Sequence, residues 1–234
     1  MKLALFGHGQ MARAVEAHVV GEGHEIGAIV TSRNAADAAR LLPGHDAAID
    51  FSVAAAVPAH VEACAAAGVP LVEGTTGWHD REAAVLRLVE ERGAALVYGA
   101  NFSIGVQVFY RVVTRAAELL QGLHAYDPFI EEAHHAKKRD APSGTALALR
   151  QILLRQLGAR DVPVASTRAG QIPGTHRVGF DSPGDQILLT HIARSRDGFA
   201  AGALLAARWI AGRRGAYAFT AVFDDILKME RSTP

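Results

Sequence analysis

The chain has 234 residues, half of them hydrophobic, and its 24 lysines and arginines balance 24 aspartates and glutamates. This balance excludes a basic surface for nucleic acid, and no apolar run reaches the roughly 18 residues that a membrane span needs. A single cysteine, Cys64, excludes an internal disulfide and suits a reducing compartment. We therefore expect a cytoplasmic protein that binds neither nucleic acid nor a membrane.

Strands and helices alternate along the first hundred residues. A short apolar run at residues 2–6 predicts a buried strand, and Met11, Val15 and Val19 recur at the spacing of a helix. The alternation then continues with strands at 25–30, 47–51, 70–73 and 95–98 and helices at 57–67 and 80–92. This order is typical of a parallel sheet with right-handed crossovers. The sequence thus predicts an α/β domain of the doubly wound Rossmann type.

The order changes after about residue 103. Helical patterns at 105–120 and 143–157 flank a strand at 128–134, and three strand-like runs follow at 162–167, 176–181 and 186–193. Consecutive strands predict a second, α+β domain on an antiparallel or mixed sheet. A helix at 199–211 and a strand at 216–220 could return to the first sheet. We therefore predict one domain from residues 1–103 plus 197–234 and another from residues 104–196.

The turn after the first strand reads Gly7-His8-Gly9-Gln10-Met11-Ala12, a G-x-G-x-x-A pattern. The first glycine permits the tight turn, and the second lets a pyrophosphate approach the backbone. The first amides of the helix then face the phosphates. Because the pattern stands between a strand and a helix, it predicts dinucleotide binding through Gly7, Gly9, Gln10 and Met11.

The second strand ends at Thr31-Ser32-Arg33, where NAD-specific sites usually have Asp or Glu. Hydroxyls and a guanidinium suit a 2′-phosphate, because Arg pairs bidentately with phosphate oxygens. The alternative is a solvent-exposed polar turn. We expect NADPH or NADH as the cofactor, with NADPH favoured through Arg33.

Two further glycine turns end later strands. Gly74-Thr75-Thr76-Gly77 follows the strand at 70–73, and Gly99-Ala100-Asn101-Phe102-Ser103 follows the strand at 95–98. In an open α/β sheet the ligand crevice lies outside the carboxyl ends of the strands. Either stretch could be a simple turn, but together they predict a nicotinamide site. The candidate residues are Gly74, Thr75, Thr76, Ala100, Asn101 and Phe102.

The stretch EEAHHAKKRDAPSGT, residues 131–145, places titratable side chains before the start of a helix. Ser143 suits the N-cap, and the first amides of the helix belong to Gly144 and Thr145, where the helix dipole favours an anion. Lys138 is near enough in sequence to add a cation. Either His134 or His135 could transfer a proton near neutral pH. The alternative is a capped helix beside a basic surface loop.

Residues 134–146 match the pattern H-H-x-x-K-x-D-A-P-S-G-T-A at every specified position. With this motif, and with the segments Ile49-Asp50-Phe51-Ser52, Gly74-Thr75-Thr76-Gly77 and Asn101-Phe102-Ser103-Ile104-Gly105-Val106, the sequence resembles the 4-hydroxy-tetrahydrodipicolinate reductase (dihydrodipicolinate reductase) family of the diaminopimelate–lysine pathway. The resemblance spans nearly the whole chain. The first glycine turn departs from it, because the extra glycine and the arginine often found there are missing.

The resemblance implies that His134 is the proton donor and Lys138 the substrate-binding cation. It implies that His135, Gly144 and Thr145 hold the substrate carboxylates, and Ser143 is a further candidate from its place at the helix start. The implied reaction moves a hydride from NAD(P)H to C4 of a cyclic dicarboxylate with loss of water. A homotetramer built through the sheet of the second domain is also implied.

Two other functions would explain part of this pattern. Another NAD(P)-dependent reductase or dehydrogenase of an amino-acid-like substrate would have the glycine turn, but would not need the H-H-x-x-K and S-G-T pieces together. A non-catalytic dinucleotide sensor would be expected to have lost its proton donors. We expect no metal site.

Overall fold

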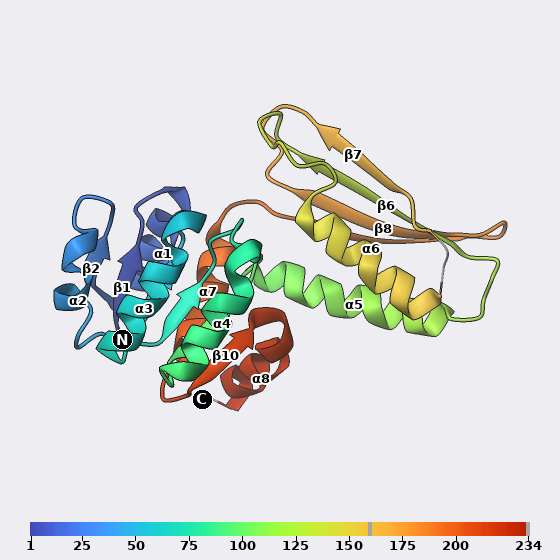
Figure 1. Ribbon diagram of the computed structural model, residues 1–234. Coiled ribbons are helices and arrows are strands. Elements are labelled where there is room, and N and C mark those ends of the chain that lie inside the picture. Colours follow the sequence, from blue (N-terminus) through green and yellow to red (C-terminus); the bar gives the residue numbers. More distant parts are fainter. Residues whose placement is uncertain (159–160, 233–234) are drawn as a thin grey trace. The chain divides into compact units, whose positions relative to one another are not determined.

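The computed structural model describes residues 1–158 and 161–232, and the chain divides into two compact units. Unit 1 combines Met1–Ser103 with the C-terminal segment from Arg196, and unit 2 is Ile104–Ser195. The chain therefore leaves the first unit once and returns to it (Figure 1). No helix in the described part of the chain is long and apolar enough to span a membrane.

Unit 1 is built on a six-stranded sheet with the strand order β10-β5-β4-β3-β1-β2, in which every pair is parallel. Its strands are β1 (Lys2–Phe6), β2 (Glu25–Val30), β3 (Ala47–Asp50), β4 (Leu71–Glu73), β5 (Ala95–Tyr98) and β10 (Gly215–Ala218). Its helices are α1 (Gln10–Gly21), α2 (Ala38–Leu41), α3 (Val57–Ala67), α4 (Glu82–Glu91), α7 (Asp197–Ile210) and α8 (Phe219–Ser232). Short 3-10 helices lie at Ala35–Asp37, Ala54–Ala56 and His79–Arg81.

Helices cover both faces of this sheet, and β1 shows how the sequence fits that arrangement. Ala4 and Phe6 pack into a core with residues of α2, α3 and α4. Leu3 and Leu5 alternate with them and are equally buried on the opposite face, where α7 packs on β3, β4 and β5 and against α1. A strand that is buried on both sides reads as a continuous apolar run, which is why the pattern of 2–6 predicts it so well.

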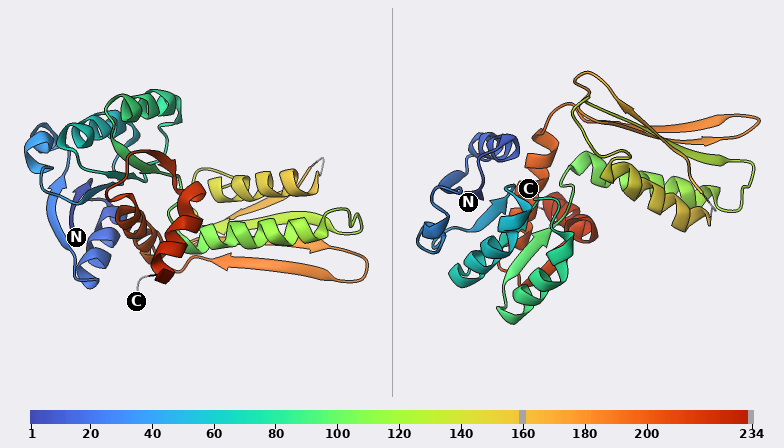
Figure 2. Two further views of the ribbon diagram at one scale, coloured as in Figure 1. Left: turned by 90° about the horizontal axis from the view of Figure 1, so that it is seen from below. Right: turned by 45° about the horizontal axis from the view of Figure 1, so that its top comes forward.

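Unit 2 has a four-stranded mixed sheet with the order β7-β6-β8-β9. Its elements are α5 (Ile104–Leu120), β6 (Asp127–His134), α6 (Gly144–Leu157), β7 (Val164–Arg168), β8 (Thr175–Asp181) and β9 (Gln186–Ile192). β6 pairs parallel with β7 and antiparallel with β8, and β8 pairs antiparallel with β9. α5 and α6 pack against each other and lie along one face of the sheet (Figures 1 and 2).

The two faces of the sheet in unit 2 differ. Ile130, Val178 and Phe180 point to the helices and are at most 1% exposed. On the other face, the ring of Phe129 covers Gly179, where a Cβ atom would lie 2.1 Å from the ring. The same open face includes Leu188 and Ile192 of β9, which alternate with the inward Leu189 and are 47% and 58% exposed. Unit 2 thus presents an uncovered, partly apolar sheet face.

The predicted fold class is confirmed: a Rossmann-type parallel sheet and a second α+β domain on a mixed sheet. The returning strand is also present as β10. The prediction that this strand reaches Thr220 is wrong, because α8 begins at Phe219. Phe219, Phe223 and Ile226 are completely buried at helical spacing, but the apolar run before them continues the strand pattern and hides the boundary.

Candidate active site

The glycine turn after β1 has the backbone that the sequence predicts. Gly7 adopts a φ of +86°, and a Cβ atom there would lie 3.1 Å from the carbonyl oxygen of Phe51. Gly9 is the N-cap of α1, and no side chain caps this helix. A Cβ atom at Gly9 would meet nothing within 4 Å, so the start of α1 is open to a ligand. An open, uncapped helix start fits the pyrophosphate of a dinucleotide.

The turn after β2 exposes the side chain of Arg33. Asn34 fixes the turn, because its side-chain oxygen accepts a hydrogen bond from the Thr31 amide at 2.7 Å. The Arg33 amide donates to the Thr31 hydroxyl at 3.3 Å. Arg33 is thus an exposed residue just after the carboxyl end of β2, the strand next to β1, where the 2′-phosphate contact is predicted.

Two buried carboxyl groups hold the turns that follow β3 and β4. Asp50 and Glu73 are register partners on these strands, and neither is exposed. The Ser52 amide donates to Asp50 Oδ1 at 2.8 Å, and the Thr75 amide donates to Glu73 Oε1 at 2.7 Å. The Thr75 hydroxyl also donates to Asp50 Oδ1 at 3.3 Å. The turns after β3 and β4, the second of which carries predicted nicotinamide residues, are thus each held by the last residue of the strand before them.

Glu73 and Asp50 are in different electrostatic situations. Asp50 Oδ2 lies 2.6 Å from His60 Nδ1, and the His60 ring stacks on Phe6 with 4.1 Å between centroids. No imidazole lies beside Glu73 in this way among the hydrogen bonds of the described residues, and its Oε2 is buried. Burial, and then the negative charge of Asp50, raise the pKa of Glu73 to about 9. Glu73 therefore remains a neutral acid beside Asp50 at neutral pH.

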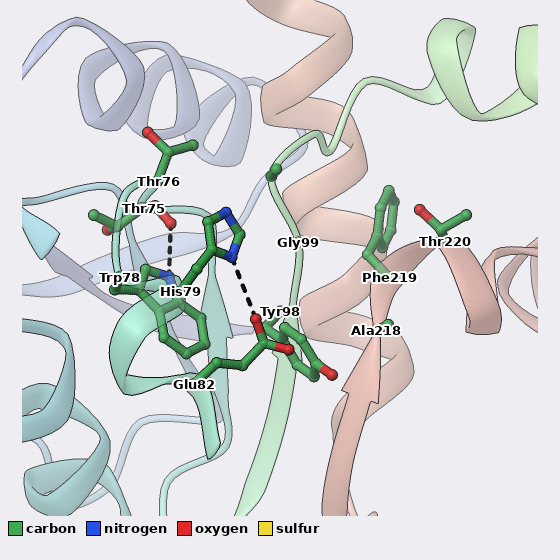
Figure 3. A pocket seen from close by; sticks show the side chains of 11 residues that line it. Thr75, Thr76, Trp78, His79, Glu82, Tyr98, Gly99, Ala218, Phe219 and Thr220 are labelled. Carbon is green, nitrogen blue, oxygen red and sulfur yellow. Dashed lines mark hydrogen bonds and ion pairs between the residues drawn. The ribbon is translucent and has the colours of Figure 1, made fainter. Parts of the chain in front are cut away.

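Figure 3 shows a pocket at the carboxyl ends of β4, β5 and β10. Trp78 Nε1 donates to the Thr75 carbonyl at 2.8 Å, which orients the indole in the pocket wall. His79 Nδ1 lies 3.3 Å from Glu82 Oε2. The lining residues are Thr75, Thr76, Trp78, His79, Glu82, Tyr98, Gly99, Ala100, Ala218, Phe219 and Thr220.

Three of the predicted nicotinamide residues, Thr75, Thr76 and Ala100, line this pocket together. Phe102 lies deeper, because it is 1% exposed and stacks on Phe219 with 4.4 Å between centroids. The side chain of Asn101 accepts a hydrogen bond from the Ser103 amide. Gly74 packs under the ring of Phe51, which a Cβ atom there would meet at 2.1 Å. These last three residues therefore shape the turns behind the pocket.

The candidate chemistry of unit 2 begins at the end of β6. Glu132 and His134 are two residues apart and share one face of the strand. His134 Nδ1 forms a short hydrogen bond with Glu132 Oε2. The other ring nitrogen, Nε2, lies beside Gly174, where a Cβ atom would be 3.2 Å away. Nδ1 of His134 is thus held by Glu132. Nε2 lies next to Gly174, which has no side chain to cover it.

The second oxygen of Glu132 is also bound. Oε1 accepts hydrogen bonds from the Arg168 guanidinium at 2.7 Å and from the Ser143 amide at 3.3 Å. Burial alone would raise the pKa of Glu132, but hydrogen bonds from Arg168, Ser166 and His134 outweigh it and lower the pKa to about 2. Glu132 is therefore a buried carboxylate at neutral pH.

Lys138 follows the strand in a short turn. Its amide donates to the carbonyl oxygen of His135 at 3.0 Å, and its Nζ lies 2.8 Å from Asp140 Oδ1. The hydrogen bond from Lys138 lowers the pKa of Asp140. Lys138 and His135 are both half-buried, whereas His134 is buried. The two histidines of the motif thus have different surroundings.

The start of α6 agrees with the predicted N-cap. Ser143 Oγ accepts a hydrogen bond from the Ala146 amide at 3.2 Å and is hydrogen-bonded to His176 Nε2 at 3.2 Å. Gly144 is exposed, and a Cβ atom there would meet nothing within 4 Å. The hydroxyl of Thr145 is hydrogen-bonded to Tyr110 of α5, whose pKa is raised by burial. The first turn of α6 is therefore open at Gly144.

His176 completes this cluster. Its ring stands edge-on to His134 with 5.1 Å between centroids. Burial, and then the positive charge of a protonated His134, lower the pKa of His176 to about 4. His176 is therefore neutral near pH 7, which suits a hydrogen-bonding role rather than a charged one.

Glu132, His134 and His176 also lie close enough to be considered as metal ligands, with candidate donor atoms within 4.8 Å of one another. However, N–H groups already occupy both oxygens of Glu132. Arg168 adds a fixed positive charge beside them, which disfavours a divalent cation. The described residues therefore form a hydrogen-bond network suited to proton transfer.

Models of the N-terminus and of the C-terminus of dihydrodipicolinate reductase match residues 1–102 and 105–223. The 4-hydroxy-tetrahydrodipicolinate reductase of Christiangramia forsetii is 35% identical over 97% of this chain and 100% of its own length. That of Myxococcus xanthus is 40% identical over 72% of this chain and 68% of its own. The chain belongs to the dihydrodipicolinate reductase family.

A solved structure agrees in fold. The dipicolinate-bound dihydrodipicolinate reductase of Paenisporosarcina sp. TG-14 has a TM-score of 0.74 and 20% identity, over 95% of this chain and 99% of that one. Family membership confirms the predicted resemblance and the predicted enzyme class, an oxidoreductase of lysine and diaminopimelate biosynthesis. The family uses NAD(P)H, and the preference of this chain stays a prediction.

Sequence reasoning missed three residues of the cluster in unit 2. Glu132 has a local signal, because it is two residues before His134 on a predicted strand. Arg168 and His176 come from β7 and β8, where they are register partners of His134 and Glu132 respectively. Only strand pairing brings them to the site, so no local pattern identifies them.

We predict that Glu73→Gln removes part of the pH dependence of stability. Because the pKa of Glu73 is raised from 4.5 to about 9 in the folded protein, only the folded state holds this proton between those values. This contribution is complete below the unfolded pKa and is lost as the pH rises towards 9. From about pH 5 to 9, the free energy of unfolding should therefore fall more steeply for the wild type than for the variant.

The measurement is urea unfolding followed by tryptophan fluorescence, since both tryptophans are buried in unit 1. Glu91→Gln, an exposed position at the end of α4, is the matched control and should keep the wild-type slope. Equal slopes for the wild type and Glu73→Gln would contradict the neutral state of Glu73.

Proposed function

We propose that this chain reduces 4-hydroxy-tetrahydrodipicolinate to tetrahydrodipicolinate with NAD(P)H. The observation that carries the proposal is the arrangement at the end of β6 in unit 2. There a histidine has one nitrogen bound and the other beside a glycine, and the strand is followed by Lys138 and by an open helix start at Gly144. A proton donor, a cation and an anion-binding helix start are the groups that an acidic cyclic substrate needs.

We propose a division of labour between the two parts of the chain. Residues 1–103 and 197–234 serve as the dinucleotide-binding domain, supported by the open start of α1. Residues 104–196 serve as the substrate-binding and oligomerisation domain, supported by the residues around His134. Gly7, Gly9, Gln10 and Met11 hold the phosphates, and the nicotinamide residues are Gly74, Thr75, Thr76, Ala100, Asn101 and Phe102.

The substrate carboxylates bind at the start of α6 in this proposal. The amides of Gly144 and Thr145 face one carboxylate, favoured by the helix dipole, and Ser143 fixes the turn as the N-cap. Lys138 supplies the cation, and its Nζ lies 2.8 Å from Asp140 Oδ1. His135 contributes the second imidazole to carboxylate binding.

The net reaction adds one hydride and one proton to the substrate and releases one water. The reduced nicotinamide, when bound, supplies the hydride for C4. His134 supplies the proton that completes the reduction, from Nε2, because Nδ1 is bound to Glu132. Imidazole is suited to proton transfer because its ordinary pKa lies near neutrality.

The first test is oxidation of NADPH by the purified protein, with the substrate made in place from pyruvate and aspartate semialdehyde by the preceding synthase. His134→Gln should lower kcat by about 10²–10⁴-fold and leave the KM for the cofactor nearly unchanged. His124→Gln, an exposed histidine in the same unit, is the control. Turnover that survives in His134→Gln would assign the proton to another group, and cofactor binding without any turnover would favour another acidic substrate or a sensor.

Arg33 is proposed to select NADPH over NADH. We expect Arg33→Ala to raise the KM for NADPH by roughly 10–100-fold, because a hydrogen bond to a charged group contributes about 1.5–3 kcal/mol. The KM for NADH, which has no 2′-phosphate, should stay nearly the same. Arg40→Ala, 75% exposed in α2, should change neither. Equal effects on both cofactors would contradict the assignment.

We propose that the chain forms a homotetramer through the open sheet face of unit 2. Support comes from the exposed Leu188 and Ile192 and from the two sheet edges, β7 and β9. Leu188→Glu should reduce the mass in size-exclusion chromatography with light scattering, from four times the 24.8 kDa chain to a smaller species. Leu119→Glu, 64% exposed on α5, should leave it unchanged. A monomeric wild type would contradict this part of the proposal.

A further inference from the structure

We infer that Glu132 is a positioning residue that orients the proton donor His134 and joins it to the substrate-anchoring start of α6. This inference rests on the proposed function, since it assigns a role toward the same reaction. Among the described residues, Glu132 forms no hydrogen bond with the cofactor segments or with Lys138. It would therefore act through His134, Ser143 and Arg168.

The position of Glu132 places its carboxylate between two groups of the candidate site. Its side chain has no exposure to solvent. One oxygen binds His134 Nδ1, and the other binds the Ser143 amide at 3.3 Å. A single rigid carboxylate therefore spans from the end of β6 to the N-cap of α6. Without this carboxylate, no hydrogen bond through Glu132 would link the position of the proton donor His134 to the start of α6.

The hydrogen bond to Glu132 decides which nitrogen of His134 is available. Because a carboxylate only accepts hydrogen bonds, Nδ1 must carry a proton. In neutral His134, Nε2 is then unprotonated, and it gains the transferable proton when the ring becomes cationic. Gly174, with a φ of +155° and no side chain, keeps Nε2 uncovered on its side.

Arg168 keeps Glu132 in the state that this role requires. A buried carboxyl without a partner would take up a proton, and it would then no longer favour a cationic His134. The guanidinium of Arg168 is held in turn, because it donates both to Glu132 Oε1 at 2.7 Å and to the carbonyl oxygen of Asp140 at 2.5 Å. The Asp140 contact also ties the network to the loop that carries Lys138.

Glu132 is the group that offsets the other influences on His134. Burial lowers the pKa of His134, and Lys138 and Arg168 lower it further. His176, edge-on to the ring, is neutral and adds no opposing charge. Glu132 acts in the other direction through its hydrogen bond and charge. Loss of its negative charge should therefore make His134 release its proton at a lower pH.

The test is the pH profile of kcat/KM for Glu132→Gln. This change keeps the size of the side chain but removes the charge, so the alkaline limb should move to lower pH by about one unit or more. A drop in kcat of about 10²-fold should accompany it, with the KM for NADPH unchanged. The matched control is Glu131→Gln, on the opposite face of β6, where Glu131 pairs with Arg177 at 3.5 Å. The control should keep the wild-type limb.

A second variant separates charge from packing. Glu132→Asp keeps the charge and shortens the reach, so its alkaline limb should stay near that of the wild type while kcat falls. An unshifted limb in Glu132→Gln, or the same shift in Glu131→Gln, would overturn the inference.

A ligand-free measurement covers the case in which Glu132→Gln does not fold. The ¹⁵N shifts of His134 in the wild-type protein should show a proton on Nδ1 in the neutral form. The opposite tautomer would overturn the inference. If the wild type does not turn over the proposed substrate, the proposed function fails, whereas the tautomer still reports on Glu132.

Discussion

The hydrogen bonds of the Glu132 carboxylate are the interactions on which the arrangement of the candidate site in unit 2 depends. An unpaired charge at a fully buried position would be costly, so Glu132 is stable there only because N–H groups satisfy both of its oxygens. These donors come from β6, from β7 and from the start of α6. One buried charge therefore fixes the relative positions of His134, Arg168 and Ser143. Hydrogen bonds inside the protein, rather than bonds to water, hold these three residues in place.

Unit 1 uses buried carboxyl groups in the same places, at the carboxyl ends of strands, but with the opposite electrostatic result. Glu132 lies beside Arg168, and its pKa falls to about 2. Glu73 lies beside another acid, Asp50, and its pKa rises to about 9. A carboxylate suits the first site, where Glu132 pairs with Arg168. A neutral acid suits the second, where Glu73 accepts a hydrogen bond from the Thr75 amide without repelling Asp50.

Much of this architecture is predictable from the sequence because it depends on local sequence patterns. The glycine turn at Gly7, the N-cap at Ser143 and the buried strands of unit 1 depend on neighbours within a few residues. Arg168 and His176 were not predictable, since strand register rather than sequence spacing brings them to His134 and Glu132. The start of α8 was missed because an apolar strand runs directly into an apolar helix face. Patterns thus predict the elements, and long-range pairing completes the site.

The most direct test of the account is a crystal structure of the protein with NADPH and dipicolinate as a cyclic dicarboxylate probe. The account predicts one carboxylate at the amides of Gly144 and Thr145, with Lys138 turned towards it. It also predicts that His134 Nε2 faces the ring of the probe while Nδ1 stays on Glu132. A probe bound away from α6, or a His134 ring that has left Glu132, would contradict it.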